Sequence, residues 1–141
     1  MKKLLSLFLV LALCFAMTAC GSEGPSEEKQ DGPLDLTGTW KQTNSQADDS
    51  WQEAIIESGT ITVNWVSDNG DTKSLYWAGS YEAPSEAATE YVWTSNNDHE
   101  QTDASLLASP DDTKIFTYKD GELSYEVSAL GTTTTVRLAK Q

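Results

Sequence analysis

The sequence has few of the residues on which catalytic and metal sites usually depend. Among its 141 residues there are two cysteines, one histidine and nine basic side chains against 22 acidic ones. Both cysteines, Cys14 and Cys20, lie in the first 20 residues. The rest of the chain therefore has no thiol for a disulfide, a thiolate nucleophile or a sulfur-ligated metal. The net charge of −13 repels phosphate backbones, which argues against a nucleic-acid partner.

The one long apolar run stands at the N-terminus. Two lysines, Lys2 and Lys3, precede an apolar stretch over residues 4–17 that a single hydroxyl, Ser6, interrupts. A charged start, an apolar middle and a small-residue end predict a secretory signal peptide over residues 1–19. The run is too short for a permanent membrane span, which needs roughly 20 apolar residues. Removing residues 1–19 would leave seven basic against 22 acidic residues, a net charge of −15.

The end of this run adds a second prediction. Residues 17–20, Met-Thr-Ala-Cys, resemble the lipobox that ends the signal peptide of bacterial lipoproteins. The resemblance implies that Cys20 carries lipid and anchors the chain to the cell membrane on its extracytoplasmic side. Two acyl chains give stable anchoring, whereas this acidic surface repels anionic headgroups. A plain secreted protein with a free N-terminal cysteine is the alternative.

Residues 20–33 differ in composition from everything after them. They are rich in Gly, Ser, Glu and Pro and contain no apolar residue suited to a core. This composition predicts a flexible acidic linker, which would hold the domain roughly 20 Å from the membrane. Residues 34–141 then form a single small domain, with no sign of an internal repeat.

The domain has the pattern of a β protein. Short runs rich in Thr, Val, Ile, Tyr and Trp alternate with Gly, Asn, Asp, Ser and Pro clusters, and no stretch has helical periodicity. We predict strands near residues 36–45, 51–57, 59–67, 72–82, 89–96, 104–109, 113–119, 121–128 and 132–139. The simplest arrangement is a small antiparallel up-and-down β-barrel of about eight strands. A β-sandwich is the alternative.

Turn signals and alternation refine this prediction. Asp68–Asp71 and Lys119–Glu122 predict tight hairpins, and Ser58-Gly59 predicts a third turn. Alternation assigns one face each to several sets of residues. These sets are Ile61, Val63 and Trp65; Leu75, Trp77, Gly79 and Tyr81; Tyr91 and Trp93; and Leu123, Tyr125 and Val127.

Residues 36–40, Leu-Thr-Gly-Thr-Trp, resemble the Gly-x-Trp opening of the calycin barrels, namely lipocalins, fatty-acid-binding proteins and avidins. The resemblance implies that Gly38 and Trp40 begin the first strand. It also implies that a basic residue on the last strand packs over the tryptophan. The sole arginine, Arg137, lies in the predicted last strand and would complete this structural seam by stacking on the indole.

The aromatic residues suggest a binding role. A barrel mouth lined by Trp77, Tyr81 and Trp93 would take a small apolar or aromatic-stacking ligand. Trp40, Trp65 and Trp77 are expected in the core, and Trp51 is expected at the surface. We therefore predict a non-enzymatic, lipid-anchored binding protein. The alternative is a cell-surface lipoprotein that interacts with an envelope protein or excludes phage and has no ligand cavity.

Other chemistry has less support in the sequence. Acidic clusters at residues 68–71, 96–100 and 111–112 raise a calcium hypothesis, but hairpin formation and solvated charge explain them without a metal. His99 lies in a polar loop and is expected at the surface. Glu82, Glu86 and Glu90 could supply a carboxylate pair, with nothing to mark two of them as convergent. We predict no catalytic residue, no metal site and no cofactor.

Overall fold

The computed structural model describes residues 32–141. The predicted signal peptide (1–19), the predicted lipid site at Cys20 and most of the predicted linker (20–33) lie outside the described residues. Within residues 32–141, no helix is both long and apolar enough to cross a membrane.

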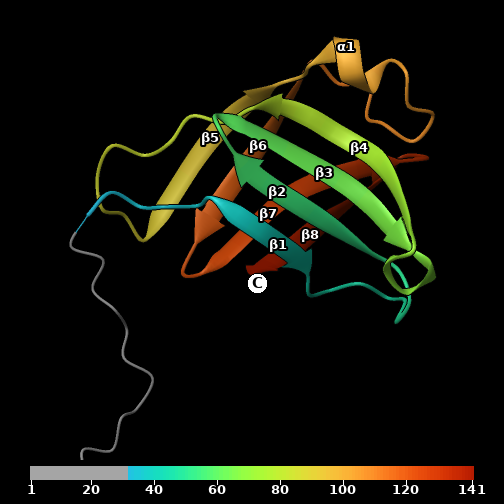
Figure 1. The fold of residues 1–141 in the computed structure, drawn as a ribbon, viewed down its shortest axis with the longest axis horizontal. Helices are drawn as coiled ribbons and strands as arrows, with labels where there is room; N and C mark the ends of the chain where they lie inside the picture. Colours follow the sequence, from blue (N-terminus) through green and yellow to red (C-terminus); the bar gives the residue numbers. More distant parts are fainter. Residues whose placement is uncertain (1–31) are drawn as a thin grey trace, which may run out of the picture.

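The domain is one antiparallel sheet of eight strands that curls into a half-barrel (Figure 1). The strand order is β4-β3-β2-β1-β8-β7-β6-β5, so β1 pairs with β8, and β4 and β5 are the two edges. The strands are β1 (Gly38–Gln42), β2 (Trp51–Glu57), β3 (Thr60–Ser67), β4 (Thr72–Ser80), β5 (Glu90–Asn96), β6 (Thr113–Lys119), β7 (Glu122–Ala129) and β8 (Thr132–Lys140). One continuous sheet confirms the predicted all-β, up-and-down architecture over the two-layer alternative.

The sheet is also a self-contained folding unit. Each of the eight strands pairs with at least one neighbour, and the buried side chains form a single cluster between Leu34 and Leu138. The aromatic and aliphatic residues on the inner face therefore find their partners within residues 32–141.

Positive backbone φ angles explain the hairpins. Ser58-Gly59 and Asp120-Gly121 form two-residue turns with positive φ at both positions, as a right-twisted hairpin requires. Leu130-Gly131, between β7 and β8, has the same geometry. The β3–β4 connection is the short 3-10 turn η1 (Asp68–Gly70), whose three residues also have positive φ. The three turns predicted from sequence are confirmed.

A β-bulge in β4 changes which residues face the core. The β3–β4 register runs from Val63–Trp77 directly to Asn64–Leu75, so Tyr76 is an extra residue on β4. Trp77 therefore shares the inner face with Val63, whereas Leu75 pairs on the other face. The prediction that Leu75 and Trp77 share a face was wrong, because the bulge interrupts the two-residue period. Tyr76 and Trp77 are both buried as a result.

The two edge strands approach each other closely at one point. Gly79 of β4 bridges Asn97, and Asp98 N donates to Ala78 O at 2.8 Å. A Cβ at Gly79 would collide with the Ser95 hydroxyl and the Asn96 carbonyl. Glycine is required here by the close backbone approach rather than by its φ angle. This seam is the short contact between β4 and β5.

The predicted strand at 104–109 is absent; it is the one predicted run that forms no strand. The short helix α1 (His99–Thr102) comes first, and the following segment runs along the edge of β4. The Ser105 hydroxyl donates to Leu75 O at 2.9 Å, and Ser109 N donates to Tyr76 O at 2.8 Å. The loop thus satisfies edge carbonyls of β4 without pairing as a strand.

The cation beside Trp40 differs from the one that the sequence suggested. Lys140 is the β8 register partner of Trp40, and its Nζ lies 5.9 Å from the Trp40 ring centroid. Arg137 is exposed and its Nη1 donates to Glu122 at 2.5 Å. Strand alternation explains the error, because Leu138 faces inward and Arg137 therefore faces outward. The β1–β8 junction exists, but the prediction that Arg137 packs there was wrong.

Candidate functional site

The three residues predicted to line the mouth are packed in the core. Trp77 is fully buried and its Nε1 donates to the Ser95 hydroxyl at 3.0 Å. Tyr81 and Trp93 contact edge to face, with ring centroids 5.2 Å apart. Burial raises the pKa of Tyr81 to about 12, so its phenol stays neutral. These side chains fill the barrel and line none of the hollows described below.

Stacked aromatic rings occupy the interior. Trp93 stacks on Phe116 with ring centroids 5.2 Å apart, and Phe116 lies 5.1 Å from Tyr125. Tyr125 in turn stacks on Tyr76 at 6.2 Å. The barrel therefore has a filled core, and binding sites must be sought at its ends and on its wall.

An apolar hollow of about 540 Å³ lies at one end of the barrel. We call it the mouth; its apolar lining includes Trp65, Tyr76, Leu106, Leu107, Val127 and Ala129. The β3–β4 turn, the β7–β8 turn and the segment after α1 meet at this end, on the right in Figure 1. Its volume suits a small ligand.

Trp65 is the aromatic residue that the mouth exposes. Its indole is 36% exposed, its Nε1 donates to Leu107 O at 3.3 Å, and its ring lies edge to face with Tyr76 at 5.4 Å. Trp65 was expected in the core; it faces the inside of the barrel but is partly exposed at the mouth. It shares the inner face with Gln52, its register partner, but the barrel is open at this level.

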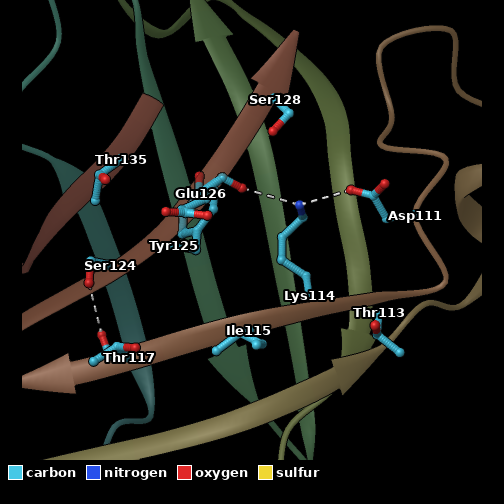
Figure 2. Close-up of a pocket in the computed structure, with 10 residues that line it drawn as sticks. All are labelled: Asp111, Thr113, Lys114, Ile115, Thr117, Ser124, Tyr125, Glu126, Ser128 and Thr135. Atoms are coloured by element: carbon cyan, nitrogen blue, oxygen red, sulfur yellow. Dashed lines mark hydrogen bonds and ion pairs between the residues drawn. The ribbon is translucent and has the colours of Figure 1, made fainter. Parts of the chain in front are cut away.

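A second hollow, of about 560 Å³, lies on the outer wall over β6, β7 and β8 (Figure 2). We call it the wall hollow; the ten residues that line it are labelled in Figure 2. It exists because β6–β7 pairing stops at Phe116–Tyr125, so the strands separate beyond that pair. Lys114 reaches into the resulting gap. The mouth and the wall hollow share only Ser128 among their lining residues.

Lys114 is a buried cation among aromatic rings. Its Nζ lies 5.3 Å from the ring centroids of both Tyr76 and Trp77, the two residues that the bulge brings together. It donates to Asp111 Oδ2 and to the Glu126 carbonyl, each at 3.3 Å. Figure 2 shows the Lys114 Nζ atom between these two acceptors.

The surroundings of Lys114 are electrostatically coupled to the nearby loop. A hydrogen bond from the Ser109 hydroxyl lowers the pKa of Asp111, burial opposes this effect, and Lys114 lowers the pKa further. Asp111 is therefore a carboxylate at neutral pH. The Lys114–Asp111 pair links the segment before β6 to the barrel wall.

A polar pair lies deeper in the barrel. The Tyr125 hydroxyl donates to Gln52 Oε1, and burial raises the pKa of Tyr125 well above its ordinary value, with Tyr76 adding to the effect. Gln52 is fully buried, and its Nε2 has no protein partner in the described part of the chain. This unpaired donor lies next to the tyrosine that lines the wall hollow.

The other candidates for chemistry are scattered. His99 is exposed and contacts Asp103 and Asp112, each at 3.1 Å. Glu90 pairs with Lys119 on the outer surface at 3.0 Å. Among residues 32–141, no group of three or more His, Cys, Asp or Glu side chains is arranged to hold a metal ion.

Lys114 is the residue that the sequence reading missed. Its signal was its place in the run Thr113–Lys119, where the inner positions are Lys114, Phe116 and Tyr118. In this strand the inward positions otherwise carry aromatic residues, so a lysine at an inward position departs from the alternation of apolar and polar side chains. The bulge that places two aromatic residues beside it leaves no comparable mark in the sequence.

Comparison of the chain with family models, with curated protein sequences and with solved structures gives no match.

Proposed function

We propose that the chain is a lipid-anchored, extracytoplasmic binding protein, non-enzymatic, that takes a small apolar or aromatic ligand at the mouth. The mouth carries this proposal: an exposed indole, a tyrosine and aliphatic side chains surround a hollow of suitable volume. Flat apolar ligands gain from stacking on such a surface.

The arrangement of the chain supports presentation of this mouth to the outside. Leu34 lies at the barrel end where β6 turns into β7, next to Gly121. The mouth includes Ala129, at the opposite end of β7. An anchor at Cys20 would therefore attach the end of the barrel far from the mouth. The Gly-x-Trp start, with a cation of the last strand beside Trp40, supports a calycin-like assignment of the half-barrel.

A second candidate is an interaction with another protein of the cell envelope. The rim of the mouth exposes Leu106 and, on the neighbouring β7–β8 turn, Leu130 is also fully exposed. Leu130 has a φ of +52°, a conformation that costs a leucine about 1–2 kcal/mol relative to an ordinary backbone. Apolar side chains that are fully exposed at this position bury no surface in the fold, but they would bury apolar surface against a partner protein.

The ligand proposal is tested with residues 32–141 and the neutral fluorescent probe N-phenyl-1-naphthylamine. We expect saturable one-to-one binding with a blue shift of the probe emission. Trp65→Ala and Leu107→Ser should each weaken binding by about tenfold, the value of one buried apolar contact.

Ile115→Ser is the matched control, because Ile115 is 60% exposed and Leu107 is 56% exposed, but Ile115 lies outside the mouth. It should leave binding unchanged. Absence of saturable binding, or an equal loss in Ile115→Ser, refutes the mouth as the ligand site.

The second candidate is tested by placing a photo-crosslinking residue at position 130 and irradiating intact cells. A partner protein should give one discrete crosslinked adduct, and the absence of such an adduct contradicts this candidate.

A further inference from the structure

The wall hollow has a buried cation, Lys114, at its floor. Lys114 occupies an inward position on β6, one alternation before the fully buried Phe116. Burying an ammonium group carries a desolvation penalty, and an apolar residue of similar length would avoid it. The position of this charge at the floor of a hollow suits the binding of an anion.

The bonding of Lys114 is incomplete. An ammonium group has three donors, and the described residues provide two acceptors, both at 3.3 Å. Charge-assisted bonds of this kind are ordinarily about 2.7–2.9 Å long. The ion-pair partner, Asp111, comes from the loop before β6, and its side chain is 58% exposed. Such a partner can be displaced by another carboxylate at little cost.

Hydroxyl groups also line the wall hollow. Besides Tyr125, whose hydroxyl group is bonded to Gln52, five lining side chains carry one: Thr113, Thr117, Ser124, Ser128 and Thr135. Ile115 adds one exposed apolar surface. Hydroxyl donors and acceptors with one apolar face match the two sides of a sugar ring, and about 560 Å³ accommodates a monosaccharide.

The charge of the whole chain disfavours ligands that carry several negative charges. A net charge of −13 repels anions at long range, and the repulsion grows with each charge that the ligand carries. A single carboxylate is therefore favoured over a phosphate.

We propose that the wall hollow is a binding site for a small hydroxylated monocarboxylate of the sugar-acid class. The Lys114 ammonium group binds the ligand carboxylate, the hydroxyl side chains bind the ring hydroxyls, and Asp111 occupies the place of the ligand carboxylate when the site is empty. The wall hollow shares only Ser128 with the mouth. The proposal for the wall hollow therefore does not depend on whether the mouth binds a ligand.

The experiment is isothermal titration calorimetry of residues 32–141 with glucuronate, and with glucose and acetate as probes that carry only half of its chemistry. We expect glucuronate to bind more tightly than either. Lys114→Met should weaken glucuronate binding by at least about tenfold, as loss of a hydrogen bond to a charged group predicts. Asp111→Asn should strengthen it by up to about fivefold, because the competing carboxylate is gone.

Lys119→Met is the matched control, since Lys119 is on the same strand and also pairs with a carboxylate, but it lies outside the hollow. It should bind glucuronate as the unchanged protein does. Trp65→Ala should do the same, which separates this site from the mouth.

The proposal is overturned by no glucuronate binding even in Asp111→Asn, by equal affinity for glucose, or by equal affinity in Lys114→Met. Equal affinity for acetate would reduce the site to a simple carboxylate site and overturn the sugar-acid class. If Lys114→Met does not fold, Asp111→Asn decides by comparison with Glu126→Gln, which removes a second carboxylate of the hollow that forms no ion pair with Lys114. A larger gain in Asp111→Asn indicates competition for the cation; equal gains, as relief of repulsion alone predicts, overturn the proposal.

Discussion

Lys140 and Trp40 are register partners across the β1–β8 junction, and the ammonium group lies 5.9 Å from the indole centroid. Lys140 also donates to Asp35 O at 3.2 Å, so it ties the segment before β1 to the last strand. A cation thus covers the tryptophan at the end of the barrel away from the mouth.

The first prediction concerns this contact. Lys140→Met should lower the free energy of unfolding by about 1 kcal/mol, because it removes a cation–π contact and a hydrogen bond to a carbonyl. Arg137→Met removes only an exposed ion pair and should cost less than about 0.5 kcal/mol. Urea unfolding measures both values. An equal or larger loss in Arg137→Met would show that Arg137 stabilises the junction.

The second prediction concerns the β4–β5 seam. Gly79→Ala should destabilise the domain by about 2 kcal/mol, because the new methyl group collides with backbone and side-chain atoms of β5. Gly32→Ala, where a Cβ meets open space, should change stability by less than about 0.5 kcal/mol. Thermal unfolding compares the two. A neutral Gly79→Ala variant would mean that the strands are not in contact there.

The third prediction concerns the β7–β8 turn. Leu130→Asn should stabilise the domain by about 1 kcal/mol, because asparagine adopts positive φ more easily and Asn-Gly is the preferred two-residue turn. The unfolding midpoint measures the gain. A loss instead would show that Leu130 packs against the domain, which would remove it as a contact for a protein partner.

The fourth prediction concerns pH. Hydrogen bonds with Asp103 and then Asp112 raise the pKa of His99 above its ordinary value of 6.5. The stabilisation is therefore complete below about pH 6.5, the pKa in the unfolded chain, and is lost as pH rises through the higher folded value. His99→Gln should remove this dependence. The difference in melting temperature between the two proteins should shrink from pH 6 to pH 8.5; a difference that grows with pH contradicts the assignment.

The fifth prediction concerns the anchor. Cells that produce the full chain should incorporate a clickable palmitate analogue into it, and Cys20→Ala should abolish the label. Cys14→Ala should keep the label, because that residue lies within the predicted signal peptide. Label that persists in Cys20→Ala would place the lipid elsewhere.

Much of the fold could be predicted from local patterns. Two-residue alternation located the eight strands, and residue pairs such as Asp120-Gly121 located the turns, because positive φ is restricted to few residue types. The failures have tertiary causes. The extra residue at Tyr76 reversed the facing of Leu75, and strand alternation placed Arg137 outside and Lys140 beside Trp40.

The candidate sites were less accessible to sequence reasoning. Tryptophan content indicated an aromatic site, but which tryptophan is exposed depends on where the barrel opens, and local sequence patterns do not reveal that level. The wall hollow depends on where the β6–β7 ladder ends, which no single residue reveals. Only the inward Lys114 left a trace in the sequence.

The strand order has a mechanical consequence for a protein tethered by its N-terminus. Force applied through residue 34 reaches the sheet at β1, which is hydrogen-bonded to β2 on one side and β8 on the other. Pulling along this strand loads both ladders in shear, so several bonds must break together. The weak β4–β5 contact lies at the far edges of the same sheet. An anchor at Cys20 would thus pull on a strand that is paired on both sides, and the tension would not act directly on the edge strands β4 and β5.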